Sequence, residues 1–173
     1  MSKLGKKPIF IPKDTNVKIE SGKLILNGPK GSKSLSINEK IFSASMLEDN
    51  KLILKVTKKN ELSNRMWGTT RSLINSAVIG VGVGFEKVLE LTGVGFRAML
   101  KGDSINLQLG FSHDTQFKVP EGVKINIEKN TIIKISGTDK QLVGKVASDI
   151  KMLKPIEPYK GKGIKERGQY VFR

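Results

Sequence analysis

The sequence predicts an α+β protein of two tandem, duplicated domains, each a small antiparallel sheet packed against one helix. Strand-like alternation of apolar and polar residues fills much of the chain, whereas only two segments have helical periodicity. Similar patterns also recur in the two halves, which is the signature of an internal repeat. A length of 173 residues allows one domain or two small ones. A set of strands covered by one helix is predicted twice along the chain, which favours two domains.

Two segments align closely enough to indicate the repeat. The stretch "IPKDTNVKIESGKLILNGPKG" (residues 11–31) aligns with "VPEGVKINIEKNTIIKISGTD" (residues 119–139). Each has an apolar residue before a proline, an alternating strand, a turn, a second alternating strand and a glycine. Chance alternation would explain the strands, but the prolines and glycines match too. We therefore expect the two halves to share a fold.

A helix is predicted near the end of each half. In the second, apolar residues recur every three or four positions and should face the sheet, at Leu142, Val143, Val146, Ala147, Ile150 and Leu153. Thr138 and Gln141 have the spacing of a capping box, and Pro155 closes the helix. In the first half, a looser helix over about residues 60–79 is marked by Leu62, Met66, Leu73, Ala77 and Val78.

The remaining strands follow from alternation and turn residues. Residues 51–56 alternate, with Leu52, Leu54 and Val56 on one side, and residues 85–111 are typical of three strands joined by two turns. The glycine-rich "GVGVG" sets the expected boundary near Gly82. This gives an N-terminal α+β repeat over residues 1–82 and a C-terminal repeat over 83–173, which ends in a basic tail at 154–173.

The charge indicates a polyanionic partner. The net charge is +15 and the pI is about 10.0, a balance that favours nucleic acid, with a membrane surface as the second possibility. Residues 1–82 hold fifteen cations and six acids, residues 83–153 hold ten and eight, and the tail holds six and two. The longest mostly apolar stretch, residues 73–85, contains three glycines and is too short to span a bilayer. We therefore expect nucleic acid and no membrane.

Three motifs that resemble known sites favour plain structural interpretations. Gly93-Val94-Gly95 with Ala98 fits a relaxed dinucleotide fingerprint, but strand-like alternation continues where that motif needs a helix. Gly28-Pro29-Lys30-Gly31 resembles the GxxG loop of KH domains, but it lies between two strands and suits a hairpin turn. His113, the only histidine, has Asp114 beside it but no second ligand or nucleophile. No cysteine is present, which excludes disulfides and thiolate metal sites. With no P-loop and no ligand set around His113, we expect no metal and no cofactor.

The tail has a composition suited to RNA. In "KPIEPYKGKGIKERGQYVFR" (residues 154–173), glycines alternate with lysines and tyrosines lie close by, and no helical or strand period fits the stretch. Glycine lets backbone amides approach phosphates, lysine neutralises them and tyrosine offers a face to a base. A solvated, disordered extension is the plain alternative. These features favour an RNA-docking element that lies outside both cores.

The chain resembles the family of bacterial large-ribosomal-subunit protein six. The carrying residues are "EPYKGKGIK" (157–165), "RMWGTTRSL" (65–73), "GFEK" (84–87), "LELTGVGFRA" (89–98) and the opening "GKKP" (5–8). The likeness covers essentially all of the chain. One departure follows Lys165, where the family often continues with a longer basic extension and this chain has "ERGQYVFR". Arg173 and Arg167 are therefore weaker candidates as contacts than the lysines.

The resemblance implies a structural, non-enzymatic constituent of the large subunit. It implies binding to 23S rRNA near the sarcin–ricin loop and stalk base, where translation factors act, with neighbouring ribosomal proteins as further partners and no small-molecule substrate. It places the protein on cytoplasmic ribosomes, in preference to an organellar matrix or stroma. Carried over by position, the implied rRNA contacts are Lys154, Tyr159, Lys160, Gly161, Lys162, Gly163 and Lys165, with Arg167 added.

Two other functions compete with this one. A free-standing RNA chaperone would have the same charge but would bind many RNAs similarly. An enzyme acting on nucleotides or acidic substrates would need a phosphate-binding loop or paired carboxylates, and the sequence has no P-loop and only scattered acids.

Overall fold

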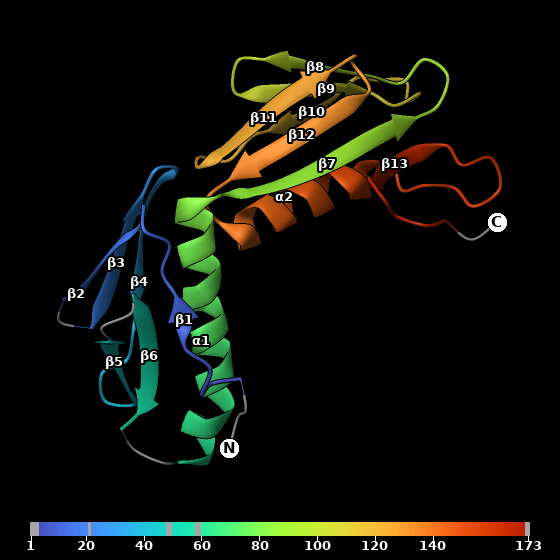
Figure 1. The fold of residues 1–173 in the computed structure, drawn as a ribbon. Helices are drawn as coiled ribbons and strands as arrows, with labels where there is room; N and C mark the ends of the chain where they lie inside the picture. Colours follow the sequence, from blue (N-terminus) through green and yellow to red (C-terminus); the bar gives the residue numbers. More distant parts are fainter. Residues whose placement is uncertain (1–3, 21, 48–49, 58–59, 172–173) are drawn as a thin grey trace. The chain divides into compact units, whose positions relative to one another are not determined.

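The computed structural model describes residues 4–20, 22–47, 50–57 and 60–171. The chain divides into two compact units, Met1–Gly84 and Phe85–Arg173. Each unit contains one long helix and several short antiparallel strands, so the predicted α+β class is confirmed (Figure 1). The expected boundary, Gly82, is the last residue of the first helix.

The first unit has two three-stranded antiparallel sheets and helix α1 (Glu61–Gly82). One sheet has the order β1-β6-β5 and the other the order β2-β3-β4. The strands are β1 (Ile9–Phe10), β2 (Asn16–Glu20), β3 (Lys23–Gly28), β4 (Gly31–Ser36), β5 (Phe42–Leu47) and β6 (Lys51–Val56).

The second unit has a four-stranded sheet of order β11-β12-β7-β13, a three-stranded sheet of order β10-β9-β8, and helix α2 (Lys140–Leu153). Figure 1 shows α2 running along the four-stranded sheet. The strands are β7 (Phe85–Thr92), β8 (Arg97–Lys101), β9 (Ser104–Gln108), β10 (Thr115–Lys118), β11 (Val123–Glu128), β12 (Ile132–Gly137) and β13 (Gly163–Glu166).

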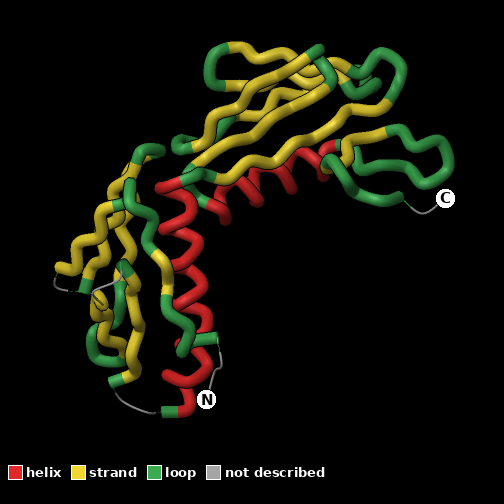
Figure 2. The backbone as a smooth tube through the Cα atoms, in the orientation of Figure 1, coloured by secondary structure: helices red, strands yellow, loops and turns green. Residues whose placement is uncertain are grey.

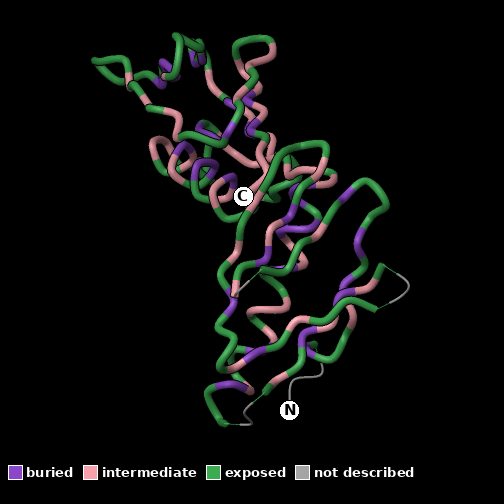
Figure 3. The backbone as a smooth tube through the Cα atoms, turned by 90° about the vertical axis from the view of Figure 1, so that its left-hand side faces the viewer, coloured by how far each residue is buried: buried purple, intermediate pink, exposed green. Residues whose placement is uncertain are grey.

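In each unit, both sheets and the helix contribute to a single hydrophobic core. The core of the second unit joins Leu89 and Ile133 of one sheet to Leu107 of the other and to Val146 and Ile150 of α2. The buried residues recur at intervals along the strands, as Figure 3 shows. The sequence predicted one sheet for each helix, and the structure divides the strands of each unit between two. Alternation reveals that a strand is half-buried but does not reveal which sheet it joins.

The two units share one topology. Read in chain order, β1 to β6 and α1 correspond to β7 to β12 and α2, because β1-β6-β5 matches β7-β12-β11 and β2-β3-β4 matches β8-β9-β10. The duplication is therefore present, but the sequence alignment used to infer it is wrong. It placed the β2–β3 hairpin on the β11–β12 hairpin, and these occupy different sheets of the repeat. Antiparallel hairpins share period-two alternation and turn glycines, so any two of them align well.

Helix α1 buries a different face from the one its most apolar residues suggest. Of the five residues that marked this helix, Ala77 and Val78 are buried, whereas Leu62, Met66 and Leu73 are exposed. The buried face is completed by Ser63, Trp67, Ile74, Gly80 and Val81. Ser63 tolerates burial because its hydroxyl accepts from the Asn60 N–H at 2.8 Å and donates to the Asn60 carbonyl at 2.7 Å.

Helix α2 follows the sequence prediction closely. Val143, Val146, Ala147 and Ile150 are buried, and Leu142 and Leu153 are half-buried against the same core. The cap differs by one residue from the expected Thr138. Asp139 is the N-cap, and its carboxylate accepts from the Gln141 N–H at 3.0 Å. Aspartate is a favoured N-cap residue, which explains why the helix begins after Asp139 and not after Thr138.

Candidate nucleic-acid interface

The segment that follows α2 forms a closed loop, shown in Figure 2 between α2 and β13. We call residues 154–163 the tail loop. Its two ends meet where Pro155 forms a parallel bridge with Ile164 and the Ile164 N–H donates to the Lys154 carbonyl at 2.9 Å. Further in, the Glu157 N–H donates to the Lys162 carbonyl at 2.8 Å, and the Gly161 N–H donates to the Glu157 carbonyl at 3.0 Å. The backbone of the loop is thus fixed by its own hydrogen bonds.

The far end of the tail loop presents its polar side chains to solvent. Tyr159 is 87% exposed, and Lys160 and Lys162 are exposed on either side of Gly161. Gly161 has a φ of 65°, a left-handed value that glycine adopts without strain. The structure therefore brings four of the candidate contact residues together at one accessible turn.

Gly163 has a structural role at the base of the loop. It is buried, and a Cβ added there would lie 2.5 Å from the Cα of Ile156 and 2.6 Å from the Pro155 carbonyl oxygen. Internal packing therefore requires glycine at position 163. Ile164 beside it is fully buried in the core of the second unit.

The expectation that the whole tail lies outside both cores is therefore wrong. Residues 163–166 form β13, which pairs antiparallel with β7 and closes that edge of the sheet. This strand has four residues and only one apolar side chain, so its own sequence carries too little alternation to reveal it.

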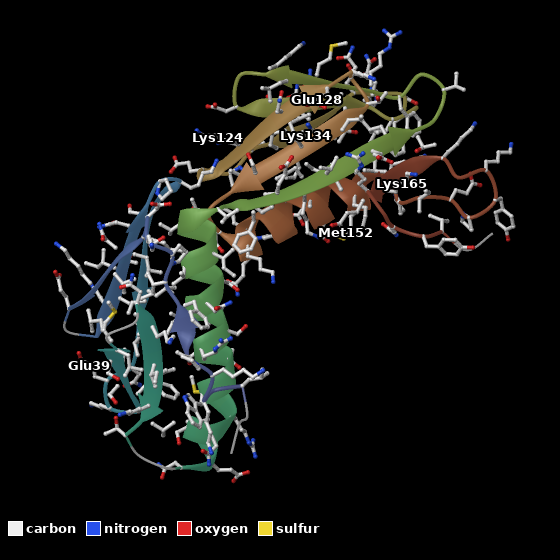
Figure 4. All side chains as sticks on the ribbon, in the orientation of Figure 1. Glu39, Lys124, Glu128, Lys134, Met152 and Lys165 are labelled. Atoms are coloured by element: carbon white, nitrogen blue, oxygen red, sulfur yellow. The ribbon has the colours of Figure 1, made fainter. Side chains whose placement is uncertain are left out.

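Lys165 on β13 and Arg167 just after it are paired with an acid of the neighbouring strand. Lys165 Nζ is 3.4 Å from one carboxylate oxygen of Glu90 on β7, and Arg167 Nε is 3.8 Å from the other. Lys87 of β7 donates to Glu166 at 2.7 Å. Figure 4 labels Lys165 on this edge strand, opposite in the sheet to Lys124 on β11. Two of the candidate contacts thus form a mixed-charge cluster, unlike the lysines of the tail loop.

Lys154 contacts a residue that the sequence did not single out. Its Nζ lies 4.4 Å from the ring centroid of Phe111, a residue in the loop after β9. Val94 lines the same hollow as Lys154, and Glu90 is paired with Lys165, although neither side chain has a charge that predicts RNA contact. Glu90 and Val94 lie within "LELTGVGFRA" (89–98), one of the stretches behind the family resemblance, whereas the only sequence signal beside Phe111 was Gly110. The last candidate, Arg173, lies outside the described residues.

The motifs set aside in the sequence are turns in the structure. Gly93 to Gly95 lie between β7 and β8 with no helix following, and Gly28 to Gly31 close the β3–β4 hairpin. His113 is exposed in the β9–β10 loop. Within the described ranges there is no group of three or more histidine, cysteine or acidic residues that could hold a metal. No helix of the described chain is long and apolar enough to cross a membrane.

Comparison with known proteins gives one consistent result. The sequence profile of the family described as Ribosomal protein L6 matches residues 92–167, which include β8 to β13 and most of the tail. A large ribosomal subunit protein uL6 from Novosphingobium aromaticivorans is 43% identical over 173 residues, which cover all of this chain and 97% of the relative.

Relatives from other lineages are equally similar. The uL6 of Staphylococcus carnosus is 44% identical over all of this chain and 96% of its own length. The uL6c of Guillardia theta is 44% identical over 99% of this chain and 94% of its own. Identity at this level over full length shows common descent and a common fold. The chain therefore belongs to the ribosomal protein L6 family, whose members are structural, non-enzymatic components of the ribosome.

Proposed function

We propose that this protein is a structural constituent of the large ribosomal subunit that binds 23S rRNA near the sarcin–ricin loop and stalk base. It would brace the region where translation factors act and would contact neighbouring large-subunit proteins there. In this role it belongs on the ribosome in the cytoplasm. The supporting observation is the tail loop, which presents Tyr159, Lys160 and Lys162 on a backbone already fixed by hydrogen bonds.

The physical basis of binding is phosphate neutralisation by a pre-organised loop. Lysines that displace condensed counterions supply sequence-independent affinity. Because hydrogen bonds already fix the loop backbone, binding pays less conformational entropy than binding by a free tail would. Tyr159 adds an aromatic face for a base or sugar. In this proposal Lys154, Lys165 and Arg167 are contacts at the loop base, on β13 and just after β13, whereas Gly161 and Gly163 shape the backbone of the tail loop.

Directed cleavage can test the location of the loop. Because the chain lacks cysteine, a Tyr159→Cys variant carries a single attachment point for an iron chelate that generates hydroxyl radicals. Incorporated into large subunits, it should cleave 23S rRNA at and around the sarcin–ricin loop. A Lys124→Cys variant, on the opposite edge of the same sheet, should give weaker cuts or cuts elsewhere. Cleavage from position 159 only at distant helices would contradict the proposed location.

Sedimentation distinguishes this function from that of a free RNA chaperone. In a lysate at moderate salt, a ribosomal constituent co-migrates with the large subunit. A pool that remains free of any particle and binds unrelated RNAs equally well would overturn the proposal.

A further inference from the structure

Three segments of the second unit surround a groove beside the tail loop. The groove has a volume of about 570 Å³ and is lined by Val94 and Phe96 of the β7–β8 turn, Leu109 and Gly110 after β9, and Lys154, Pro155, Glu157 and Lys162 of the tail loop. Its size lies within the range of roughly 300–1,000 Å³ that small-ligand sites occupy. We call it the loop groove.

Buried apolar side chains form the floor of the loop groove, and exposed apolar side chains lie at its wall. Phe96 and Leu109 belong to the buried core. Val94, by contrast, is 95% exposed at the tip of its turn, and Phe111, which follows the lining residue Gly110 and contacts the lining residue Lys154, is 49% exposed. Exposed apolar side chains gathered around a hollow mark a binding surface more often than single exposed residues do.

The charges around the groove suit an anionic ligand with a flat apolar part. Lys154 and Lys162 line it from opposite ends of the tail loop, and Glu157 is the single acid among the lining residues. Lys154 Nζ also lies 4.4 Å from the Phe111 ring centroid, which places a cation beside an aromatic face. A nucleotide combines an anionic phosphate with a planar base, and aromatic stacking is largely tolerant of base identity.

We propose that the loop groove receives one unpaired nucleotide of the rRNA, with its base against Phe111 and Val94 and its phosphate on Lys154 and Lys162. The proposal rests on the proposed function and specifies how one part of that interface is occupied. Duplex RNA would not fit, since its bases are stacked inside the helix and its readable edges are restricted. Glu157 can accept a hydrogen bond from an exocyclic amino group, which favours a base that carries one over uracil.

Two substitutions test the groove without removing a cation. Phe111→Ala removes the aromatic face, and Val94→Asp puts a charge into the apolar wall at an exposed turn position. Ser148→Asp is the matched control, because it adds the same charge on the exposed side of α2. Each full-length variant is titrated with a 23S rRNA transcript at several salt concentrations, after circular dichroism and thermal melting have confirmed folding.

We expect Phe111→Ala to weaken binding about fivefold or more, since stacking on one aromatic ring accounts for at least that factor. Its salt slope should equal that of the wild type, because no phosphate contact is lost. Val94→Asp should weaken binding at least as much, and Ser148→Asp should not. If Phe111→Ala folds normally and binds like the wild type, the groove is not the nucleotide site, whatever the result for Val94→Asp.

Photocrosslinking gives an independent result. Irradiation of the wild-type complex at short wavelength should link RNA to the peptide that contains residues 109–114. Crosslinks confined to other peptides would contradict the proposal. Failure of this inference can be distinguished from failure of the proposed function. If only the inference fails, the wild type still binds 23S rRNA with the salt dependence supplied by the tail lysines. If the proposed function fails, the wild type binds no rRNA specifically.

Discussion

Lys165 and Glu90 face each other across the β13–β7 pair, with 3.4 Å between the ammonium nitrogen and a carboxylate oxygen. Arg167 shares the same carboxylate at 3.8 Å. A partly exposed pair of this kind contributes little to stability, about 0–1 kcal/mol. It does, however, offset the positive charge of these two cations. Lys165 and Arg167 should therefore attract phosphate less strongly than the lysines of the tail loop.

Removing this acid should strengthen RNA binding. We expect Glu90→Gln to steepen the salt dependence of 23S rRNA binding by up to roughly one unit, because the released cations can contact phosphate. The free energy of unfolding should fall by less than about 1 kcal/mol. Glu86→Gln is the control, because it makes the same charge change at an exposed position of the same strand. Equal strengthening by both variants would show that only the net charge matters.

Two glycines of the second unit should respond in opposite directions to alanine. Gly163→Ala places a methyl group 2.5 Å from the Ile156 Cα at a φ of 137°, so we expect a loss of about 2–4 kcal/mol from overpacking and backbone strain. Gly144 in α2 has open space around its Cβ position, so Gly144→Ala should add about 0.5–1 kcal/mol through helix propensity. Urea denaturation measures both changes, and a Gly163→Ala variant as stable as the wild type would refute the packing role.

The buried face of α2 gives a third prediction. Val146 is 2% exposed in the core of the second unit. Val146→Ala should cost about 1–2 kcal/mol, because it removes buried methyl groups and leaves a cavity. Lys145→Ala, at the neighbouring exposed position, should change stability by less than about 0.5 kcal/mol. A chemical denaturation midpoint that is equal for Val146→Ala and wild type would place this face outside the core.

The fold class could be predicted from the sequence because it depends on local patterns. The two periods, the turn glycines and the helix of the second half are each encoded within a few residues. Local patterns do not predict which stripe of α1 is buried. Leu62, Met66 and Leu73 form an apolar stripe of their own, and the buried stripe includes Ser63 and Trp67. Trp67 donates its indole N–H to the Leu54 carbonyl at 2.9 Å, a contact between segments that no local pattern contains.

In the tail as well, the features that the sequence did not predict are those that depend on pairing between distant segments. The cations of the tail loop were visible as composition, and four of the candidate residues do gather at its exposed turn. The burial of Ile164 and the pairing of Lys165 with Glu90 depend on β7, some seventy residues earlier in the chain. The contact between Lys154 and Phe111 likewise joins two loops that are remote in sequence. Such contacts depend on the assembled sheets and have no local signature.

The proposed function depends above all on neutralisation of rRNA phosphates by the lysines of the tail loop. The most direct measurement is the slope of log affinity for 23S rRNA against log salt concentration, compared between the wild type and a Lys160→Ala, Lys162→Ala double variant. Each lost phosphate contact should flatten the slope by somewhat less than one unit, so we predict a change of about one to two units. Unfolding stability should be unchanged, since both side chains are exposed. Lys124→Ala, on the opposite edge of the sheet, should change the slope less. A double variant that keeps the wild-type slope and affinity, together with a Lys124→Ala variant that loses both, would contradict the claim.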